Sequence, residues 1–295
     1  VRACDAGLAA EHQIAVTVFC NEWLKEAKQF IRNNTKLSVH IKCDTGMGRL
    51  GYRDSEQIKK AEQLIGQSSV YILEGCFTHF ATADEINTEY YEQQYSKFIE
   101  LLDAFSSPPE IIHSSNSAST FRFEKAWFNG IRLGISMYGL SPSAEMKELI
   151  PFPLKESLTL HTKIVNVKKI EVGAGVSYGV EHKAEEEEWI ATLPIGYADG
   201  WLRKISGQEV LIDGTRMPIV GRVCMDQCMV RLPKYYPVGT PITLIGKNGN
   251  EFISIDEIAE RLQTINYEVI CLISARVPRV YKRNGVVQNI SNSIV

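Results

Sequence analysis

The sequence predicts an α/β domain built on a parallel sheet, followed by a second, mainly β domain. In the first half of the chain, short apolar runs alternate with amphipathic helical segments at the spacing of βα units. From about residue 151, short strand-like runs follow one another and are separated by Gly, Pro and Asp turns. We therefore place the two domains at residues 1–150 and 151–295.

Five strands are predicted in the first domain, and helical segments lie between most of them. The strand candidates are residues 14–20 (IAVTVFC), 37–44 (LSVHIKCD), 70–80 (VYILEGCFTHF), 110–117 (EIIHSSNS) and 127–135 (WFNGIRLGI). The helical segments are residues 2–13, 21–34, 55–67 and about 87–104. This interval between strands is typical of parallel βα units.

Period-two alternation assigns the side chains of these strands to faces. Val39 and Ile41 share one face of the second strand, while His40 and Lys42 share the other with Asp44. In the third strand, the same alternation puts His79 on the face of Leu73, Gly75 and Phe77. Polar groups at the carboxyl ends of parallel strands are where barrels hold their active sites.

One helix is predicted in the second domain, at residues 254–263. Ser254 is its expected N-cap, and Glu257, three residues later, completes a capping box. The remaining runs read as strands. They lie within residues 157–170, 187–196, 208–214, 216–223, 227–232 and 240–246.

Composition excludes several classes of function. The formal net charge is −3 without a basic cluster, so no nucleic-acid partner is expected. No apolar run approaches the length of a membrane span, and no membrane partner is expected either. The cysteines are seven in number, and Cys224 and Cys228 lack the second ligand pair of a zinc site. We expect reduced thiols in a cytoplasmic protein, and no metal site.

Eight motifs occur in order along the whole chain. They are KCDTGMGRLGYR, FTHFATADE, HSSNSAS, IRLGISMYGL, GAGVSYG, PIGYADGW, VGRVCMDQCMV and TINYEVICLISARVPRVY. Together they resemble the alanine racemase family, which uses pyridoxal 5'-phosphate (PLP). The resemblance implies an α/β protein with a (β/α)8 (TIM) barrel, N-terminally incomplete here, followed by a mainly β C-terminal domain.

The resemblance also implies how PLP is held. Arg132 matches the arginine that hydrogen-bonds the pyridine nitrogen. Because an arginine does not give up its proton, it leaves that nitrogen unprotonated and the ring a weaker electron sink. Phosphate contacts are expected from a second set of groups, with Asn116 beside them. They are Ser117, the backbone amides of Gly134 and Ile135, and the hydroxyl of Tyr267.

Catalytic roles follow from the same resemblance. Tyr178 matches the tyrosine that moves the α-proton on one face of the substrate, acting on the cofactor of the partner subunit. His79 matches the histidine that links this tyrosine to Arg132. The expected reaction interconverts L-alanine and D-alanine by two-base proton transfer on a PLP aldimine. It would supply D-alanine for peptidoglycan, in a homodimer with shared active sites.

Substrate contacts are implied as well. Arg49 resembles the arginine near the PLP phenolic oxygen and the substrate carboxylate. Lys42 matches a lysine that is often carbamylated, which would turn it into an anion able to fix Arg49. Tyr197 and Met225, supplied by the partner, would line substrate entry and the carboxylate end of the pocket.

One motif of the family is absent. The lysine that anchors PLP lies in a stretch similar to VVKANAYGHG, and nothing like it occurs in residues 1–295. A barrel also needs eight strands, whereas five are predicted. We expect a chain that lacks its beginning and is inactive alone. Racemisation of alanine by residues 1–295 with added PLP would contradict this expectation.

Other functions remain open at this point. A PLP decarboxylase of the same barrel architecture would place an acidic residue at the pyridine nitrogen, where this sequence has Arg132. A racemase of serine or another amino acid is separated from an alanine racemase only by pocket volume, at about 1–3 kcal/mol per methylene. A non-catalytic truncated product is the third alternative.

Overall fold

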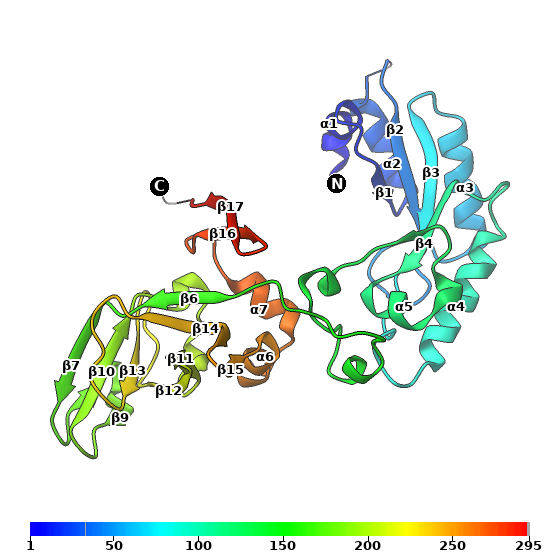
Figure 1. Cartoon of the computed structure of the whole chain (residues 1–295). Coiled ribbons are helices and arrows are strands. Elements are labelled where there is room, and N and C mark those ends of the chain that lie inside the picture. Colours follow the sequence, from blue (N-terminus) through cyan, green and yellow to red (C-terminus); the bar gives the residue numbers. More distant parts are fainter. Residues whose placement is uncertain (33, 294–295) are drawn as a thin grey trace. The chain divides into compact units, whose positions relative to one another are not determined.

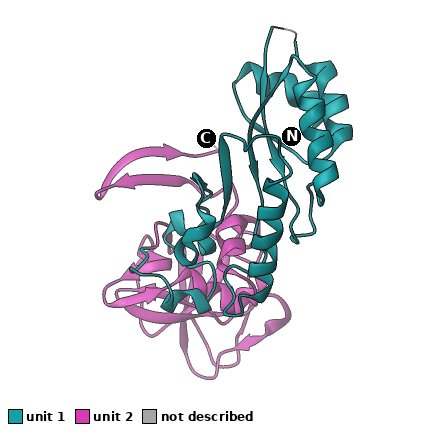
Figure 2. Ribbon diagram, turned by 90° about the vertical axis from the view of Figure 1, so that its right-hand side faces the viewer, with its two compact units in different colours: residues 1–155 teal, residues 156–295 magenta. Residues whose placement is uncertain are grey.

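The chain divides into two compact units. The computed structural model describes residues 1–32 and 34–293 (Figure 1). One unit is Val1–Lys155 and the other is Glu156–Val295 (Figure 2).

A five-stranded parallel sheet forms the centre of the first unit. Its strands are β1 (Val16–Val18), β2 (Leu37–Lys42), β3 (Tyr71–Phe77), β4 (Ile111–Ser115) and β5 (Gly130–Ile131). They pair in chain order, each parallel to the next. All five predicted strands are confirmed. Each is shorter than predicted, and in β2, β3 and β4 the polar residues at the carboxyl end lie outside the strand.

Five α-helices belong to the described part of this unit. They are α1 (Ala6–Glu11), α2 (Asn21–Ala27), α3 (Ser55–Gly66), α4 (Glu89–Leu102) and α5 (Ser117–Arg122). Helix α5 corrects the prediction of strand up to residue 117. Asn116 and Ser119 form a capping box, in which the Asn116 side chain accepts from the Ser119 amide at 3.0 Å and starts the helix there.

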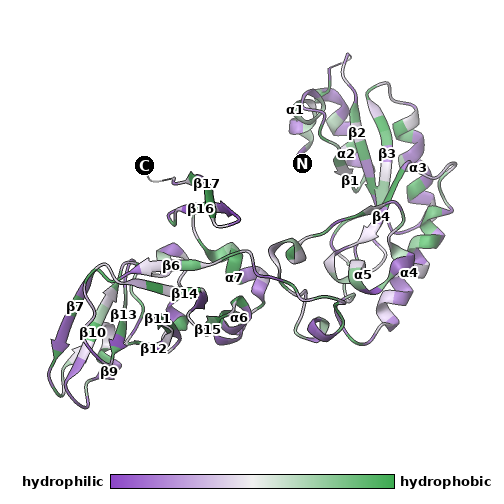
Figure 3. Cartoon of the chain, in the orientation of Figure 1, coloured by the Kyte–Doolittle hydropathy of each residue, from purple (hydrophilic) through white to green (hydrophobic). Residues whose placement is uncertain are grey.

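The core of the first unit lies between the sheet and its helices. Leu37, Val39 and Ile41 of β2 are fully buried, as are Ile58 of α3 and Phe98 of α4. Each such side chain contributes about 1.5–3 kcal/mol by its burial. Helices α3 and α4 show both hydrophobic and hydrophilic residues along their length, as amphipathic helices do (Figure 3).

A bulge in β3 changes the predicted assignment of faces. Val39 pairs with Leu73, but His40 pairs with Gly75, so Glu74 is an extra residue. Leu73 therefore lies on the core side with Val39, whereas Gly75 and Phe77 lie on the side of His40 and Lys42. The prediction that Leu73 shares a face with Gly75 is wrong, because an inserted residue shifts the period.

The second unit is mainly antiparallel sheet. Its eight-stranded sheet runs in the order β15-β14-β11-β12-β13-β10-β7, and β6 pairs with β14. The strands are β6 (Leu160–Lys163), β7 (Asn166–Ile170), β10 (Glu188–Leu193), β11 (Glu209–Ile212), β12 (Thr215–Val220), β13 (Cys228–Leu232), β14 (Pro241–Asn248) and β15 (Glu251–Ile253). Two small hairpins accompany it. They are β8 (Gly175–Val176) with β9 (His182–Lys183), and β16 (Arg279–Arg283) with β17 (Val286–Ser291).

Two α-helices follow in this unit, where one was predicted. Helix α6 (Ile255–Leu262) begins at Ser254, whose Oγ accepts from the Glu257 amide at 3.0 Å. The Glu257 carboxylate accepts from Arg216 and Gln208, so the predicted box is formed only on the serine side. Helix α7 (Asn266–Leu272) was not predicted, because its β-branched and aromatic residues are weak helix formers.

Candidate active site

Three basic side chains converge at the carboxyl edge of the parallel sheet. Lys42 ends β2, His79 follows β3, and Arg132 follows β5. The Lys42 Nζ and the Arg132 Cζ each lie 5.0 Å from the centroid of the Phe77 ring. The structure thus brings Lys42 and Arg132 together around one aromatic side chain.

The Arg132 guanidinium is fixed by acceptors on both terminal nitrogens. Nη1 donates to the Nδ1 and the carbonyl of His113, at 2.6 and 3.0 Å. Nη2 donates to the carbonyls of Thr78 and Ser114 at 2.7 and 3.2 Å, and to His79 Nδ1 at 3.2 Å. Burial lowers the pKa of Arg132 to about 10, so it remains a cation near neutrality. Among the described residues, no acceptor meets its Nε–H.

His79 is a neutral acceptor in this arrangement. Burial, followed by the charges of Arg132, Lys42 and Arg49, lowers its pKa to about 4. Because an arginine only donates, Nδ1 of His79 must accept, and its proton lies on Nε2. The ring therefore offers an N–H on the side away from Arg132.

Lys42 is a buried cation without an acidic partner among the described residues. Its side chain is only 2% exposed, and its Nζ donates to the Cys43 carbonyl at 3.3 Å. Burial and the nearby Arg132 lower its pKa to about 8, with a smaller contribution from Arg49. A fraction of Lys42 is thus a neutral amine near neutral pH.

In the glycine-rich loop after β2, backbone amides donate hydrogen bonds to a side chain of the same loop. Asp44 is buried and accepts from the amides of Gly46 and Gly48, at 3.3 and 2.9 Å. Gly51 has φ 125°, and a Cβ there would lie 2.7 Å from the Lys42 carbonyl. The loop is a tight turn that carries Arg49, which is exposed, and it is no cradle for phosphate.

Ser117 and Gly134 meet beside this cluster of predicted residues. The Gly134 amide donates to Ser117 Oγ at 2.8 Å, so the serine hydroxyl proton remains to be donated. Ile135 is buried and begins the 3-10 helix η4 (Ile135–Tyr138). Asn116 precedes Ser117 and donates from its Nδ2 to the Phe80 carbonyl at 3.3 Å. Its side chain is therefore committed to the start of α5 and to the loop after β3.

Tyr178 lies in the second unit, in a loop with a constrained backbone. Its side chain is 69% exposed. The preceding Ser177 has φ 66°, which is uncommon for a non-glycine residue, and its Oγ donates to the Arg222 carbonyl at 2.6 Å. The neighbouring Gly221 has no room for a Cβ, which would lie 2.7 Å from the Val176 carbonyl. These constraints hold the tyrosine away from the core of its unit.

Tyr197 and Met225 lie next to each other in the same unit. The Tyr197 amide donates to the Cys224 carbonyl at 3.1 Å, and Ser177 Oγ lies 3.5 Å from Cys224 Sγ. Both Tyr197 and Met225 are exposed. The loops that carry Tyr178, Tyr197 and Met225 therefore meet at Cys224 and its neighbour. Tyr267, on α7, is partly exposed as well.

Two family models cover most of the sequence. The model described as "Alanine racemase, N-terminal domain" matches residues 1–142, and "Alanine racemase, C-terminal domain" matches residues 157–281. The chain belongs to the alanine racemase family. The fold class predicted from the motifs is thereby confirmed.

Characterised relatives agree with this family. Alanine racemase of Geobacillus kaustophilus is 52% identical over 290 residues, which are 98% of this chain and 76% of the relative. Alanine racemase of Geobacillus stearothermophilus is 52% identical over 99% of this chain and 76% of its own length.

Solved structures of the alanine racemase family are similar as well. The alanine racemase from Bacillus anthracis with bound L-Ala-P has a TM-score of 0.96 and 47% identity, covering 100% of this chain and 77% of that one. The histidine racemase from Leuconostoc mesenteroides has a TM-score of 0.87 and 32% identity, covering 93% and 74%. Solved racemases named for two different amino acids thus share this fold.

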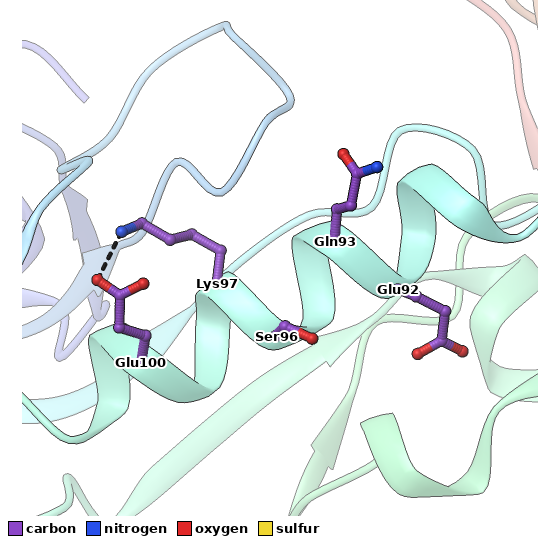
Figure 4. Close-up of a pocket in the computed structure, with 5 residues that line it drawn as sticks. All are labelled: Glu92, Gln93, Ser96, Lys97 and Glu100. Atoms are coloured by element: carbon purple, nitrogen blue, oxygen red, sulfur yellow. Dashed lines mark hydrogen bonds and ion pairs between the residues drawn. The ribbon is translucent and has the colours of Figure 1, made fainter.

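A surface hollow of about 490 Å³ lies elsewhere, along α4 (Figure 4). It is lined by Glu92, Gln93, Ser96, Lys97 and Glu100, of which Lys97 and Glu100 form an ion pair of 2.6 Å. These are exposed or half-buried polar residues of a helix face, and none is a predicted site residue. The described residues also include no metal-binding cluster and no helix that could span a membrane.

Sequence reasoning missed several residues that contact the predicted ones. His113 accepts from Arg132, and His113 is in turn hydrogen-bonded to His40. His113 stands in the quoted motif HSSNSAS, and His40 was placed on the face of Lys42, but neither received a role. The signal that could have found them is the order of the parallel strands, since it makes β4 the neighbour of both β3 and β5.

Proposed function

We propose that this protein is an alanine racemase that interconverts L-alanine and D-alanine with PLP as its cofactor. The observation that carries the proposal is the Nε–H of Arg132, a fixed donor without an acceptor among the described residues. It lies in a cluster that holds Lys42 as a second cation and keeps His79 and His113 neutral. Such a cluster suits a ligand with a neutral ring nitrogen and anionic groups.

The donor set fits PLP. Arg132 would donate to the pyridine nitrogen, and Ser117 and the Ile135 amide would bind the phosphate. The Gly134 amide, which donates to Ser117 Oγ, would join them by sharing its hydrogen between that oxygen and the phosphate. Ser117 retains a hydroxyl proton for this purpose, because its oxygen accepts from Gly134. Tyr267 would add its hydroxyl, and Asn116 is proposed to support Ser117 from the start of α5.

PLP, when bound to an amino acid, supplies the delocalisation that makes the α-hydrogen acidic. The protein then has to move that proton on a defined face. Tyr178 is proposed as the acid and base for one face, acting from the partner subunit of a homodimer. His79 is proposed to orient Tyr178 by donating from Nε2, since its Nδ1 already accepts from Arg132.

Arg49 is proposed to bind the substrate carboxylate, with Lys42 as its support. A neutral amine is the form that reacts with CO2, and the lowered pKa of Lys42 makes that form accessible. The resulting carbamate would be an anion among Arg132 and Arg49, and it would remove an uncompensated buried charge. A signal of ¹³C-bicarbonate-derived carbamate, absent in Lys42→Gln, tests this modification.

Alanine is the substrate we propose, with Tyr197 and Met225 lining its pocket. The support is the 47% identity to a racemase solved with L-Ala-P, against 32% for the histidine racemase. A racemase of serine or another amino acid is the second candidate, because that histidine enzyme shares the fold.

A cytoplasmic role in making D-alanine for peptidoglycan completes the proposal. All seven cysteines are free in the described residues, which is usual in a reducing compartment. The exposure of Tyr178 and Met225 supports a homodimer in which each subunit completes the site of the other.

The test is a racemase assay on the protein as its gene encodes it, including any residues before Val1. With PLP present, we expect D-alanine to form from L-alanine, with a kcat/KM at least tenfold above those for serine and histidine. Matched reactions without PLP, and with Tyr178→Phe, serve as controls. Formation of D-serine or D-histidine in preference to D-alanine would contradict the proposed substrate.

A further inference from the structure

A row of hydrogen-bonded side chains extends from Arg132 across the parallel sheet. Arg132 Nη1 lies 2.6 Å from His113 Nδ1, and His113 Nε2 lies 2.9 Å from His40 Nδ1. His40 Nε2 then meets the Glu74 carboxylate at 2.9 Å. We call His113, His40 and Glu74 the histidine relay. Its members come from three adjacent strands, β4, β2 and β3.

The two ends of the relay determine the direction of every bond. Arg132 can only donate, so His113 Nδ1 accepts and its proton lies on Nε2. That Nε2–H donates to His40 Nδ1, and the proton of His40 lies on Nε2 as well. The Glu74 carboxylate can only accept, which agrees with this direction at the far end. A single tautomer of each ring satisfies the whole row.

The backbone of β3 is shaped to admit the relay. Glu74 is the inserted residue of the bulge, and a bulge of this kind redirects a side chain. Gly75 lies opposite His40, where a Cβ would be 2.5 Å from both Nδ1 and Cε1 of the imidazole. Only glycine leaves space for the ring at this position, so the sequence of β3 allows the His40 ring to lie against the strand.

The His113 ring of the relay is also held from the side. Phe77 stacks on the His113 ring, with centroids 4.7 Å apart and planes 9° apart. Burial, followed by the charge of Arg132, lowers the pKa of His113 to about 3, so the ring is neutral at any physiological pH. All three relay residues are half-buried, and the Glu74 side chain is 31% exposed against 14% for His40.

Arg132 has no carboxylate within ion-pair distance among the described residues. Its direct acceptors are carbonyls and imidazole nitrogens, and Glu74 is the anion at the end of its hydrogen-bonded row. Chains of hydrogen bonds polarise one another in a low-dielectric interior. A negative charge at Glu74 therefore strengthens the acceptor at His113 Nδ1.

We propose that His113, His40 and Glu74 are positioning residues, which orient the Arg132 guanidinium so that its Nε–H points to the cofactor's pyridine nitrogen. This inference rests on the proposed function in its last step. The relay itself is a property of the protein without ligand, and it can be measured separately.

The first measurement needs neither cofactor nor activity. Protein labelled with ¹⁵N-histidine, as its gene encodes it, gives ring-nitrogen shifts that report tautomer and charge. We expect His113 and His40 to be neutral with the proton on Nε2. In Glu74→Gln the His40 signals should move, because the amide replaces the carboxylate. A proton on Nδ1 of His113, or a charged His113, would overturn the relay.

The second measurement follows PLP in the same variants. Glu74→Gln should weaken PLP binding about 10-fold, the loss expected for one charge-assisted hydrogen bond. It should also shift the absorbance maximum of bound PLP and lower kcat with little change in KM for alanine. Glu56→Gln, which changes an exposed carboxylate on α3, is the matched control. A Glu74→Gln protein that equals this control in affinity and spectrum would contradict the inference. A wild-type protein without racemase activity but with the expected tautomers would contradict only the proposed function.

Discussion

At the level of single residues, the site contains two cationic side chains that form no ion pair with a carboxylate among the described residues. Lys42 is buried and Arg132 is half-buried near it, and the partial loss of water lowers the pKa of both groups. The histidines between them are kept neutral, so they add hydrogen bonds without adding charge. This arrangement favours an anionic ligand, at a cost to the stability of the empty protein.

The loss of folding stability caused by this buried charge can be measured at Lys42. Its pKa falls from 10.5 to about 8, which makes the protonated form about 3 kcal/mol less favourable in the folded protein at neutral pH. Between pH 8 and 10.5 the folded protein binds fewer protons at Lys42 than the unfolded chain, so stability should rise with pH there. Lys42→Met should be more stable than wild type at pH 7 in buffers free of CO2.

Denaturant unfolding at pH 7 and pH 10 checks this prediction. The advantage of Lys42→Met should shrink at the higher pH, because the wild-type lysine has by then become neutral in the folded state. Lys36→Met, at an exposed lysine, is the control. Equal stability of Lys42→Met and wild type at both pH values would mean that Lys42 bears no uncompensated charge.

Many of the individual site residues could be predicted from the sequence. Alternation and strand ends indicated that polar residues such as Lys42 and His79 lie near the carboxyl ends of their strands, where an active site was expected. The role of Glu74 could not be predicted from the sequence, since alternation assigns its side chain to the wrong face of β3 unless the bulge is known. A bulge depends on pairing with β2, which is a tertiary property and leaves little trace in the local sequence.

At the scale of elements, β3 illustrates how a strand is adapted to a site. Gly75 and the extra residue Glu74 weaken an ideal strand, yet they make room for the imidazole of His40. Two helices were not predicted from the sequence. Helix α5 depends on the capping box of Asn116 and Ser119, and helix α7 forms although its residues have low helix propensity. Helix α3 was predicted correctly because its apolar residues recur at helical spacing and Asp54 caps it.

Gly75→Ala should destabilise the protein by about 1–3 kcal/mol. The added methyl would meet the His40 ring at 2.5 Å and the Ile111 carbonyl at 2.6 Å. Gly66→Ala on α3 is the matched control, because nothing lies within 4 Å of its Cβ position and its φ is negative. That change should be neutral, or stabilise by about 0.4–1 kcal/mol. Chemical unfolding followed by circular dichroism gives both values, and equal effects of the two substitutions would contradict the account of β3.

At the scale of the whole molecule, the proposed site needs two copies of the chain. Arg132 belongs to one unit of the chain and Tyr178 to the other. In the proposed homodimer, the tyrosine of one subunit serves the cofactor of its partner. The motif order revealed both units, whereas the sharing of sites comes from the family resemblance and is a proposal.

Mixing two defective proteins tests the sharing of sites. Arg132→Ala and Tyr178→Phe should each lose most racemase activity. Subunits refolded or co-expressed together should recover activity, because about a quarter of the sites combine an intact Arg132 with an intact Tyr178. No recovery in verified heterodimers would show that each site is built from a single chain.

In the mechanism we propose, Tyr178 moves the α-proton of alanine at a site organised by Arg132. Proton NMR of L-alanine in D2O, with PLP and the protein as its gene encodes it, tests this directly. We expect the α-proton signal to disappear while D-alanine accumulates, and Tyr178→Phe to slow both by about 10²–10⁴-fold. Retention of the α-proton signal in wild type with bound PLP, or undiminished rates in Tyr178→Phe, would contradict the account.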